Sequence, residues 1–298
     1  MTQAFSLTGL VKTYPGFSLG PLNLDLAPGT VLGYVGPNSS GKTTTFHCMM
    51  GLARPESGEL EVFGREAGPG SPAWKLDVGY VGDLHTFYEG WTGERNLAFR
   101  SRFYPNWSQQ RAADLARRFA LPLDKKAKTL STGNRVKLSL VSALAHSPRL
   151  LLLDEPTAGL DPVVRREVLD ALFEVLEDGE RSIFYATHIL SDISRLADEI
   201  AFLRGGKLIR RSRKDDLLDK WRRISFRSGK ADLSLDAVVA HDREGSGHRV
   251  ISWDAAATLA GLAAAGAESV EETRMTLEDI AVEILKAGGK GGDDVANS

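Results

Sequence analysis

The sequence contains very little cysteine, since Cys48 is the only one among 298 residues. A single thiol excludes an internal disulfide framework and any zinc site built from several cysteines, and it suits a reducing compartment. Because Cys48 falls within a predicted helix, we expect it to be a buried packing residue rather than a reactive thiol.

Long hydrophobic runs and an excess of charge are also missing. No apolar run approaches the ~20 residues that cross a bilayer, and residues 1–5 lack the charged and apolar regions of a signal peptide. The 37 Lys and Arg residues are balanced by 39 Asp and Glu residues, which gives a net charge of -2. The chain therefore lacks the overall positive charge that attracts nucleic acid. We therefore expect a soluble, cytoplasmic chain without a nucleic-acid partner. With 42% hydrophobic residues, it can hold one large α/β core and a small second domain.

Residues 36–43 contain the most specific pattern, Gly-Pro-Asn-Ser-Ser-Gly-Lys-Thr, which fits the phosphate-loop motif. The apolar run 31–35 before it predicts a buried strand, and a helix can begin at residue 44. In that setting, backbone N–H groups and the positive end of the helix dipole face bound phosphate. The predicted nucleotide-binding residues are Gly36, Pro37, Asn38, Ser39, Ser40, Gly41, Lys42, Thr43 and Thr44.

Individual residues of this loop have separate expected tasks. Gly36 and Gly41 permit backbone angles and close approaches that a Cβ would obstruct. Lys42 can reach the β- and γ-phosphates, and the hydroxyl of Thr43 can bind Mg²⁺.

A second motif lies at the end of a leucine run. Residues 150–153 predict a strand buried inside a parallel sheet, and Asp154 and Glu155 follow at its carboxyl end, where α/β proteins bind ligands. One carboxylate there can hold Mg²⁺ and the other can orient an attacking water. Thr157 is then expected to cap a helix over residues 162–177.

The strand predicted over residues 181–188 ends in His188. A lone histidine is usually structural, but one at the carboxyl end of a core strand can meet a γ-phosphate, and the residues alone leave both interpretations open.

The remaining organisation follows from patterning. Apolar and polar residues alternate over 3–35, and together with residues 60–64 this pattern predicts an antiparallel β-layer. Residues 91–147 read as helical, with helix starts at Thr92 and Ser108. An aromatic cluster in this part is expected to be core, with an exposed partner-binding patch as the alternative; its members are Trp91, Phe99, Phe103, Tyr104 and Trp107.

The composition changes near residue 211. The charged segment 210–216 is interpreted as a solvated linker that leads into a helix, and residues 214–287 predict a small α+β domain. The Gly- and Asp-rich residues 288–298 are expected to be disordered.

These residues together resemble the ATP-binding subunit of an ABC transporter over roughly residues 3–210. The resemblance implies a P-loop NTPase core over residues 1–213, with an antiparallel β-subdomain and an ABC helical subdomain at about 84–147. Residues 36–43 match the Walker A loop and 150–155 the Walker B strand, while Asp161 matches the D-loop and His188 the switch histidine. Tyr14 fits the A-loop aromatic that stacks on adenine, although position alone favours a surface tyrosine.

The family's signature and Q-loop are also recognisable, with departures. Asp83 stands where a Gln is usual, so an anionic ligand replaces an amide near Mg²⁺ and the attacking water. In the signature Leu-Ser-Thr-Gly-Asn, a threonine replaces a glycine and an asparagine replaces a glutamine. The signature residues implied to contact ATP from another subunit are Ser131, Thr132, Gly133 and Asn134.

The resemblance implies a mechanism and partners. Two ATPase subunits, identical or paralogous, pair head to tail around ATP and Mg²⁺, and their closure drives separate membrane permease subunits. Glu155 polarises water, His188 supports the γ-phosphate, Asp154, Thr43 and Asp83 surround the metal, and Asp161 links the two sites. The sequences of residues 103–107 and 277–280 resemble those of ATPases from exporters of drugs, antibiotics or lipids. This resemblance implies a peripheral position on the cytoplasmic face of the membrane. A soluble ABC ATPase that acts outside transport is the alternative.

Overall fold

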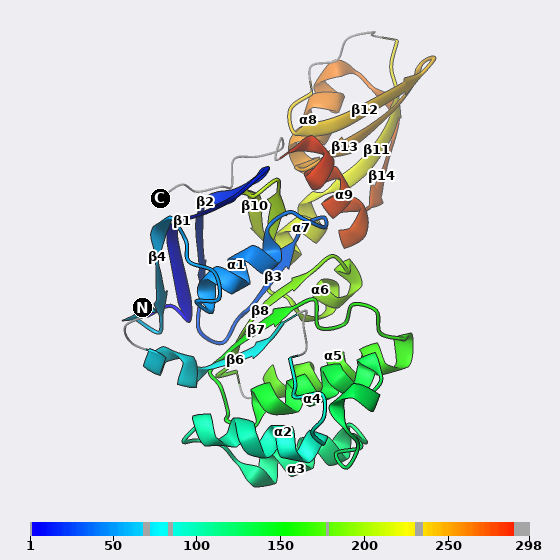
Figure 1. Ribbon diagram of the computed structural model, residues 1–298. Coiled ribbons are helices and arrows are strands. Elements are labelled where there is room, and N and C mark those ends of the chain that lie inside the picture. The colour runs from blue at the N-terminus through cyan, green and yellow to red at the C-terminus, as the bar shows by residue number, and fades with distance from the viewer. Residues whose placement is uncertain (1, 68–71, 83–85, 177–178, 230–234, 289–298) are drawn as a thin grey trace.

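The computed structural model describes residues 2–67, 72–82, 86–176, 179–229 and 235–288 (Figure 1). Its centre is a six-stranded sheet formed by β3 (Val31–Val35), β6 (Val78–Val81), β7 (Leu150–Asp154), β8 (Ser182–Thr187), β9 (Glu199–Arg204) and β10 (Lys207–Arg213). The strand order is β10-β9-β3-β8-β7-β6, and every pair is parallel except β10 with β9. β3, β7 and β8 are buried along their whole length, because helices or a second sheet cover both faces.

The first face of this sheet packs on α1 (Lys42–Met49) and on an antiparallel sheet. Alternate residues of the central strands, such as Leu32, Leu152 and Phe184, share one core cluster with the antiparallel layer. Cys48 belongs to this cluster and is buried, as expected. The layer has the order β2-β1-β4-β5 and consists of β1 (Phe5–Tyr14), β2 (Phe17–Leu26), β4 (Ser57–Val62) and β5 (Arg65–Glu66). The predicted antiparallel layer is confirmed.

The second face packs on helices, most of which lie in the lower part of Figure 1. The intervening residues of the same strands, such as Val35, Leu153 and Tyr185, form a separate cluster with these helices. They are α2 (Gly93–Arg100), α3 (Gln109–Arg118), α4 (Thr132–Leu144), α5 (Pro162–Leu176) and α6 (Leu190–Leu196), with 3-10 turns at Ser101–Phe103 and Ala127–Thr129. A further 3-10 turn, Pro72–Asp77, packs through Trp74 in the cluster of the first face. The predicted α/β class is therefore confirmed. None of the helices in the described ranges has both the length and the apolar character needed to cross a bilayer.

The starts of these helices follow the expected chemistry in two cases and differ in a third. The hydroxyls of Thr92 and Ser108 accept hydrogen bonds from backbone N–H groups in the first turns of α2 and α3. Thr157, however, does not cap α5. That helix begins at Pro162, and the Asp161 carboxylate accepts the N–H groups of residues 163 and 164 at 3.0 and 3.1 Å.

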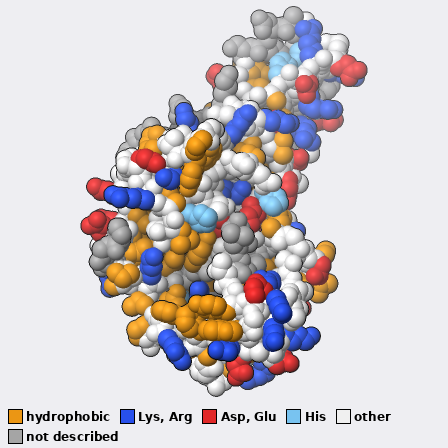
Figure 2. All heavy atoms as spheres, viewed as in Figure 1, with side chains coloured by type: hydrophobic (Ala, Val, Ile, Leu, Met, Phe, Trp, Pro, Cys, Tyr) orange, Lys and Arg blue, Asp and Glu red, His pale blue; other side chains and the backbone are white. Residues whose placement is uncertain are grey.

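The aromatic residues of the helical layer include an exposed group, which we call the aromatic patch: Tyr88, Trp91, Phe99 and Phe103. The Phe99 ring lies 5.2, 5.7 and 5.2 Å from the rings of Tyr88, Trp91 and Phe103. Phe103 is 59% exposed and Tyr88 is 52% exposed. Figure 2 shows hydrophobic side chains gathered over this end of the molecule. The expectation that the cluster is core is therefore wrong for Phe103.

The C-terminal part contains a third sheet of order β12-β13-β11-β14. α8 covers one side of it, through Leu262 against Ile224, Phe226 and Val250. The elements are α7 (Lys214–Lys220), β11 (Arg222–Arg227), β12 (Val238–Glu244), β13 (Gly247–Ser252), α8 (Ala255–Ala265), β14 (Glu268–Arg274) and α9 (Leu277–Ala287).

This part is attached to the main core without a solvated linker. β10 continues to Arg213, and Arg210 is buried, so the linker interpretation of residues 210–213 is wrong. Trp221 and Ile280 belong to the same core cluster as residues of α6 and β9. α9 therefore contributes to the core of the six-stranded sheet as well as to the C-terminal part.

We expect Ile280→Ala to lower the free energy of unfolding by about 2–5 kcal/mol, because it removes a fully buried side chain from the main core. Val282→Ala, on the same helix but 44% exposed, should change it by less than about 0.5 kcal/mol. Urea denaturation of the full chain measures both. Equal effects of the two substitutions would contradict the packing of α9 described above.

A second prediction concerns His146, which is 1% exposed directly after α4. Its Nε2–H donates to the Val78 carbonyl at 3.2 Å, and its ring stacks on Tyr104 at 4.0 Å. Burial lowers the pKa of His146 from 6.5 to about 4. Below pH 6.5, His146 binds a proton in the unfolded chain but stays neutral in the folded chain. The free energy of unfolding therefore falls as the pH falls towards 4.

The loss should reach about 3 kcal/mol at pH 4, on the scale of 1.36 kcal/mol per pKa unit. Urea titrations of wild type and His146→Gln between pH 7 and pH 4 isolate this contribution, since glutamine keeps an N–H donor but does not titrate. The variant should lose less stability than wild type over this range. Parallel pH curves for the two proteins would show that His146 is not the group responsible.

Candidate functional site

The phosphate loop joins the end of β3 to the start of α1, as predicted. Gly41 precedes the helix with φ +112°, which strains any residue that has a Cβ. At Gly36 the obstacle is space, because a Cβ would lie 2.4 Å from the Leu203 carbonyl oxygen. Both glycines are thus required by the local backbone, and the loop leads directly into the N-terminus of α1.

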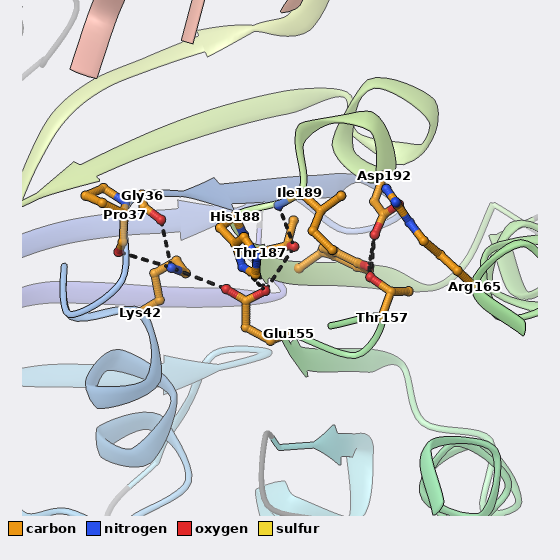
Figure 3. Close-up of polar contacts among 11 residues, drawn as sticks. Gly36, Pro37, Lys42, Glu155, Thr157, Arg165, Thr187, His188, Ile189 and Asp192 are labelled. Carbon is orange, nitrogen blue, oxygen red and sulfur yellow. Dashed lines mark hydrogen bonds and ion pairs between the residues drawn. The ribbon is translucent and has the colours of Figure 1, made fainter. Parts of the chain in front are cut away.

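Lys42, the first residue of α1, folds back over the loop (Figure 3). Its Nζ donates to the carbonyl oxygens of Gly36 at 2.8 Å and Pro37 at 3.3 Å, and the residue is only 6% exposed. The same atom lies 3.4 Å from Oε1 of Glu155. The ammonium group is therefore held between the phosphate loop and the end of β7.

Glu155 follows β7 in a strained conformation. Its φ of +50° lies in the left-handed region, which is uncommon for a residue with a side chain. The backbone N–H donates to the Ala186 carbonyl at 2.9 Å. Backbone strain of about 1–3 kcal/mol at a single residue is typical of functional sites, and here the strained turn directs the carboxylate towards Lys42.

The other oxygen of Glu155 accepts hydrogen bonds from the end of β8. Oε2 lies 3.1 Å from the Thr187 hydroxyl, 3.3 Å from the His188 backbone nitrogen and 2.9 Å from His188 Nδ1. Thr187 in turn accepts the N–H of Ile189 at 2.9 Å. Because Nδ1 of the histidine donates to the carboxylate, the opposite ring nitrogen, Nε2, points away from Glu155. The sequence left the role of His188 open, and this contact places it in the site.

Oxygen donors for a divalent cation are present at the same edge. Asp154, the last residue of β7, is fully buried, and Thr43 lies partly exposed in the first turn of α1. A carboxylate and a hydroxyl are the kinds of ligand that Mg²⁺ prefers. The third residue predicted for the metal, Asp83, lies outside the described residues. Among the residues described, no group of three or more His, Cys, Asp or Glu side chains is arranged to hold a metal ion.

Tyr14 lies at the end of β1, beside the phosphate loop. Tyr14 pairs with Phe17 across the hairpin. The ring of Phe17 in turn lies against Gly41 of the phosphate loop, so closely that a Cβ on Gly41 would be 3.0 Å from it. Tyr14 is 41% exposed, with the Lys12 ammonium group 5.1 Å from its ring centre. Its ring is thus available for stacking near the loop.

The signature residues lie elsewhere. Ser131 caps α4 and accepts the Asn134 N–H at 3.3 Å, while Thr132, Gly133 and Asn134 form the first turn. α4 packs on the sheet face opposite α1, and no hydrogen bond or ion pair found among the described residues joins residues 131–134 to residues 36–44. Ser131 and Thr132 are exposed. Within one chain the structure therefore does not bring the signature to the phosphate loop.

Comparison with known proteins identifies the family. The family model described as "ABC transporter" matches residues 19–158. The bacitracin transport ATP-binding protein BcrA of Bacillus licheniformis is 30% identical over 212 residues, which cover 70% of this chain and 69% of BcrA. The chain belongs to the ABC transporter ATP-binding proteins.

Other relatives agree. The daunorubicin/doxorubicin resistance ATP-binding protein DrrA of Streptomyces peucetius is 35% identical over 214 residues, and the match covers 70% of this chain but only 64% of DrrA. A solved ATP-binding subunit of an ABC transporter superposes with a TM-score of 0.66 at 26% identity, over 72% of this chain and 92% of that one. This ABC protein is therefore an ATP-binding subunit of the ABC transporter type.

Sequence reasoning missed several polar residues of this ATPase subunit. Thr187 was visible as a polar end to a buried strand, next to His188, but no role was assigned to it. Asp192 lies four residues after His188 and is fully buried, together with its partner Thr157. Its position four residues after His188 was the one indication in the sequence that Asp192 lies near the site. The partners of Asp192 come from distant segments and could not be predicted.

Proposed function

We propose that this chain powers the export of a small molecule across the cytoplasmic membrane, together with separate membrane subunits, by hydrolysing Mg·ATP between two ATPase subunits. The names of relatives supply the direction, because they include drug resistance proteins and a Nod factor export protein. Transport is thereby favoured over the soluble ABC ATPase considered as the alternative.

The observation that carries the mechanism is the position of Glu155 between Lys42 and His188. Lys42 would bind the β- and γ-phosphates, since its ammonium group is fixed over the loop. The Glu155 carboxylate would orient the attacking water, and His188 would donate from Nε2 to the γ-phosphate when both of its ring nitrogens carry protons. The three groups belong to different strand ends, so hydrolysis requires the intact sheet edge.

Asp154 and Thr43 would hold Mg²⁺, and Asp83 is proposed as a further ligand. The oxygen chemistry of this donor set fits a hard cation. When bound, Mg²⁺ would neutralise negative charge on the phosphates. The residues Pro37, Asn38, Ser39, Ser40 and Thr44 complete the proposed phosphate-binding loop and helix start.

The second half of the site is proposed to come from another ATPase subunit, identical or paralogous. Ser131 and Gly133 start a helix whose N-terminal N–H groups suit an anion, and Ser131 is exposed. Asp161, at the exposed start of α5, would link the two sites. A solved ATP-binding cassette in a dimeric post-hydrolysis state, with ADP and Pi bound, shares the fold at a TM-score of 0.64 and 21% identity.

Membrane subunits are proposed to dock on the aromatic patch. Its rings are in mutual contact and two of them are more than half exposed, which is unusual for large apolar side chains without a partner. An apolar cytoplasmic segment of a membrane protein would cover them. That contact would place the chain on the cytoplasmic face of the membrane.

We expect Glu155→Gln to lower the kcat of ATP hydrolysis by at least about 100-fold, because an amide cannot act as a base towards water. Affinity for Mg·ATP should change little, and the variant should accumulate as an ATP-bound dimer in light scattering. Glu174→Gln, which removes a half-exposed surface carboxylate, is the control and should retain activity. Full turnover by Glu155→Gln would refute the proposed role.

For Tyr14, replacement by alanine should weaken ATP binding by about 1–3 kcal/mol, the usual contribution of one base stacked on an aromatic ring. Tyr14→Trp should bind ATP as wild type does, because it retains a stacking face. Fluorescence titration with an ATP analogue measures both affinities. If Tyr14→Ala binds ATP normally, the tyrosine is a surface residue, as its position alone suggested.

A further inference from the structure

Asp192, on α6, is a fully buried carboxylate with partners from three segments (Figure 3). Oδ1 accepts from Arg165, with Nε at 2.8 Å and Nη2 at 2.6 Å. Oδ2 accepts from the hydroxyls of Thr157 and of Tyr185, the latter at 3.0 Å. Both oxygens are therefore satisfied by donors that are themselves partly or fully buried.

The partners of Asp192 lie close in sequence to the proposed catalytic residues. Asp192 itself follows His188 by four residues, and Thr157 follows Glu155 by two. Arg165 lies one turn into α5, where its N–H donates to the Asp161 carbonyl at 2.9 Å. One side chain thus connects the turn that carries His188, the turn that carries Glu155 and the helix that begins after Asp161.

The cost of burying a charge keeps Asp192 bound to its partners. A buried carboxylate is costly unless every partner stays in place, so Asp192 resists separation from Thr157 and Arg165. Burial and the nearby carboxylate raise the pKa of Tyr185, so its phenol remains a donor. A shift of α6 relative to the Glu155 turn would break several of these bonds at once.

We propose that Asp192 is a positioning residue for ATP hydrolysis, which fixes the His188 turn against the Glu155 turn through Thr157 and Arg165. The inference rests on the roles proposed above for Glu155 and His188. Asp192 acts on the site through the 2.9 Å contact between Nδ1 of His188 and Oε2 of Glu155. This contact exists only while the two turns keep their separation. Lys42 and the phosphate loop are not part of the cluster, so nucleotide binding does not depend on it.

The chain offers a matched control on the same two helices. Asp170 on α5 and Arg195 on α6 form an ion pair at 2.5 Å, but their side chains are 43% and 42% exposed. Asp170→Asn therefore removes a carboxylate that bridges α5 and α6 without touching Thr157 or Tyr185. Exposed pairs of this kind contribute little to stability.

The test compares steady-state ATP hydrolysis by the full-length wild type, Asp192→Asn and Asp170→Asn. Asp192→Asn should lower kcat by about 10- to 100-fold, the cost of small misplacements of catalytic groups, with KM for ATP within about twofold. Asp170→Asn should leave both constants unchanged. An Asp192→Asn enzyme with wild-type kcat, or one whose loss lies in KM, would overturn the proposal.

Asp192→Asn leaves the Arg165 charge without its partner and could unfold the chain. Thr157→Val and Thr157→Ser avoid this, because both keep the ion pair: valine replaces the hydroxyl by a methyl group, whereas serine keeps the hydroxyl and loses the methyl group. Thr157→Ser should keep most of the kcat that Thr157→Val loses, with both variants shown to be folded at the assay temperature by their thermal unfolding curves. Equal kcat for these two variants would contradict positioning through the hydroxyl.

Glu155→Gln, assayed in parallel, separates this inference from the function on which it rests. If Glu155→Gln is inactive while Asp192→Asn and Thr157→Val are fully active, only the positioning role fails. If Glu155→Gln turns over ATP normally, the proposed catalytic role fails, and the positioning role fails with it.

Discussion

In-register pairing of the parallel strands β3, β8 and β7 brings three chain turns together at one edge of the central sheet. Val35 pairs with Thr187, and Asp154 pairs with Ala186, so the strands end side by side. The phosphate loop, the Glu155 turn and the His188 turn leave from these neighbouring ends. Contacts of about 3 Å among Lys42, Glu155 and His188 follow from this register, since a shift by one residue would separate them.

The same register explains why much of the site could be predicted from the sequence. A polar or acidic residue after a buried apolar strand marks the carboxyl end of that strand, and parallel strands share that edge. Asp154, Glu155 and His188 carry this signal, and the phosphate loop carries its own glycine pattern. Local rules also sufficed for the caps at Thr92 and Ser108, where a hydroxyl directly before the helix accepts the backbone N–H group three residues later.

What could not be predicted depends on contacts between distant segments. Thr157 looked like a helix cap, but its hydroxyl bonds to Asp192, 35 residues away, and Asp161 caps the helix instead. Arg210 looked like part of a solvated linker, but it is buried and lies near the ring of Trp221. Phe103 looked like core because aromatic residues usually are, and hydropathy does not show which face of a short helix lacks a neighbour.

The short helix α6 shows how these long-range contacts act on the site. It has seven residues, and a helix of this length is marginal in isolation, so its position depends on what packs around it. Asp192 holds one side by polar bonds to Thr157 and Arg165, while Ile193 and Leu196 lie in the apolar core with Ile280 of α9. α6 therefore lies between the turn of Glu155 and the last helix of the chain. His188, two residues before the start of α6, is placed by tertiary contacts on two sides of that helix rather than by local helix propensity.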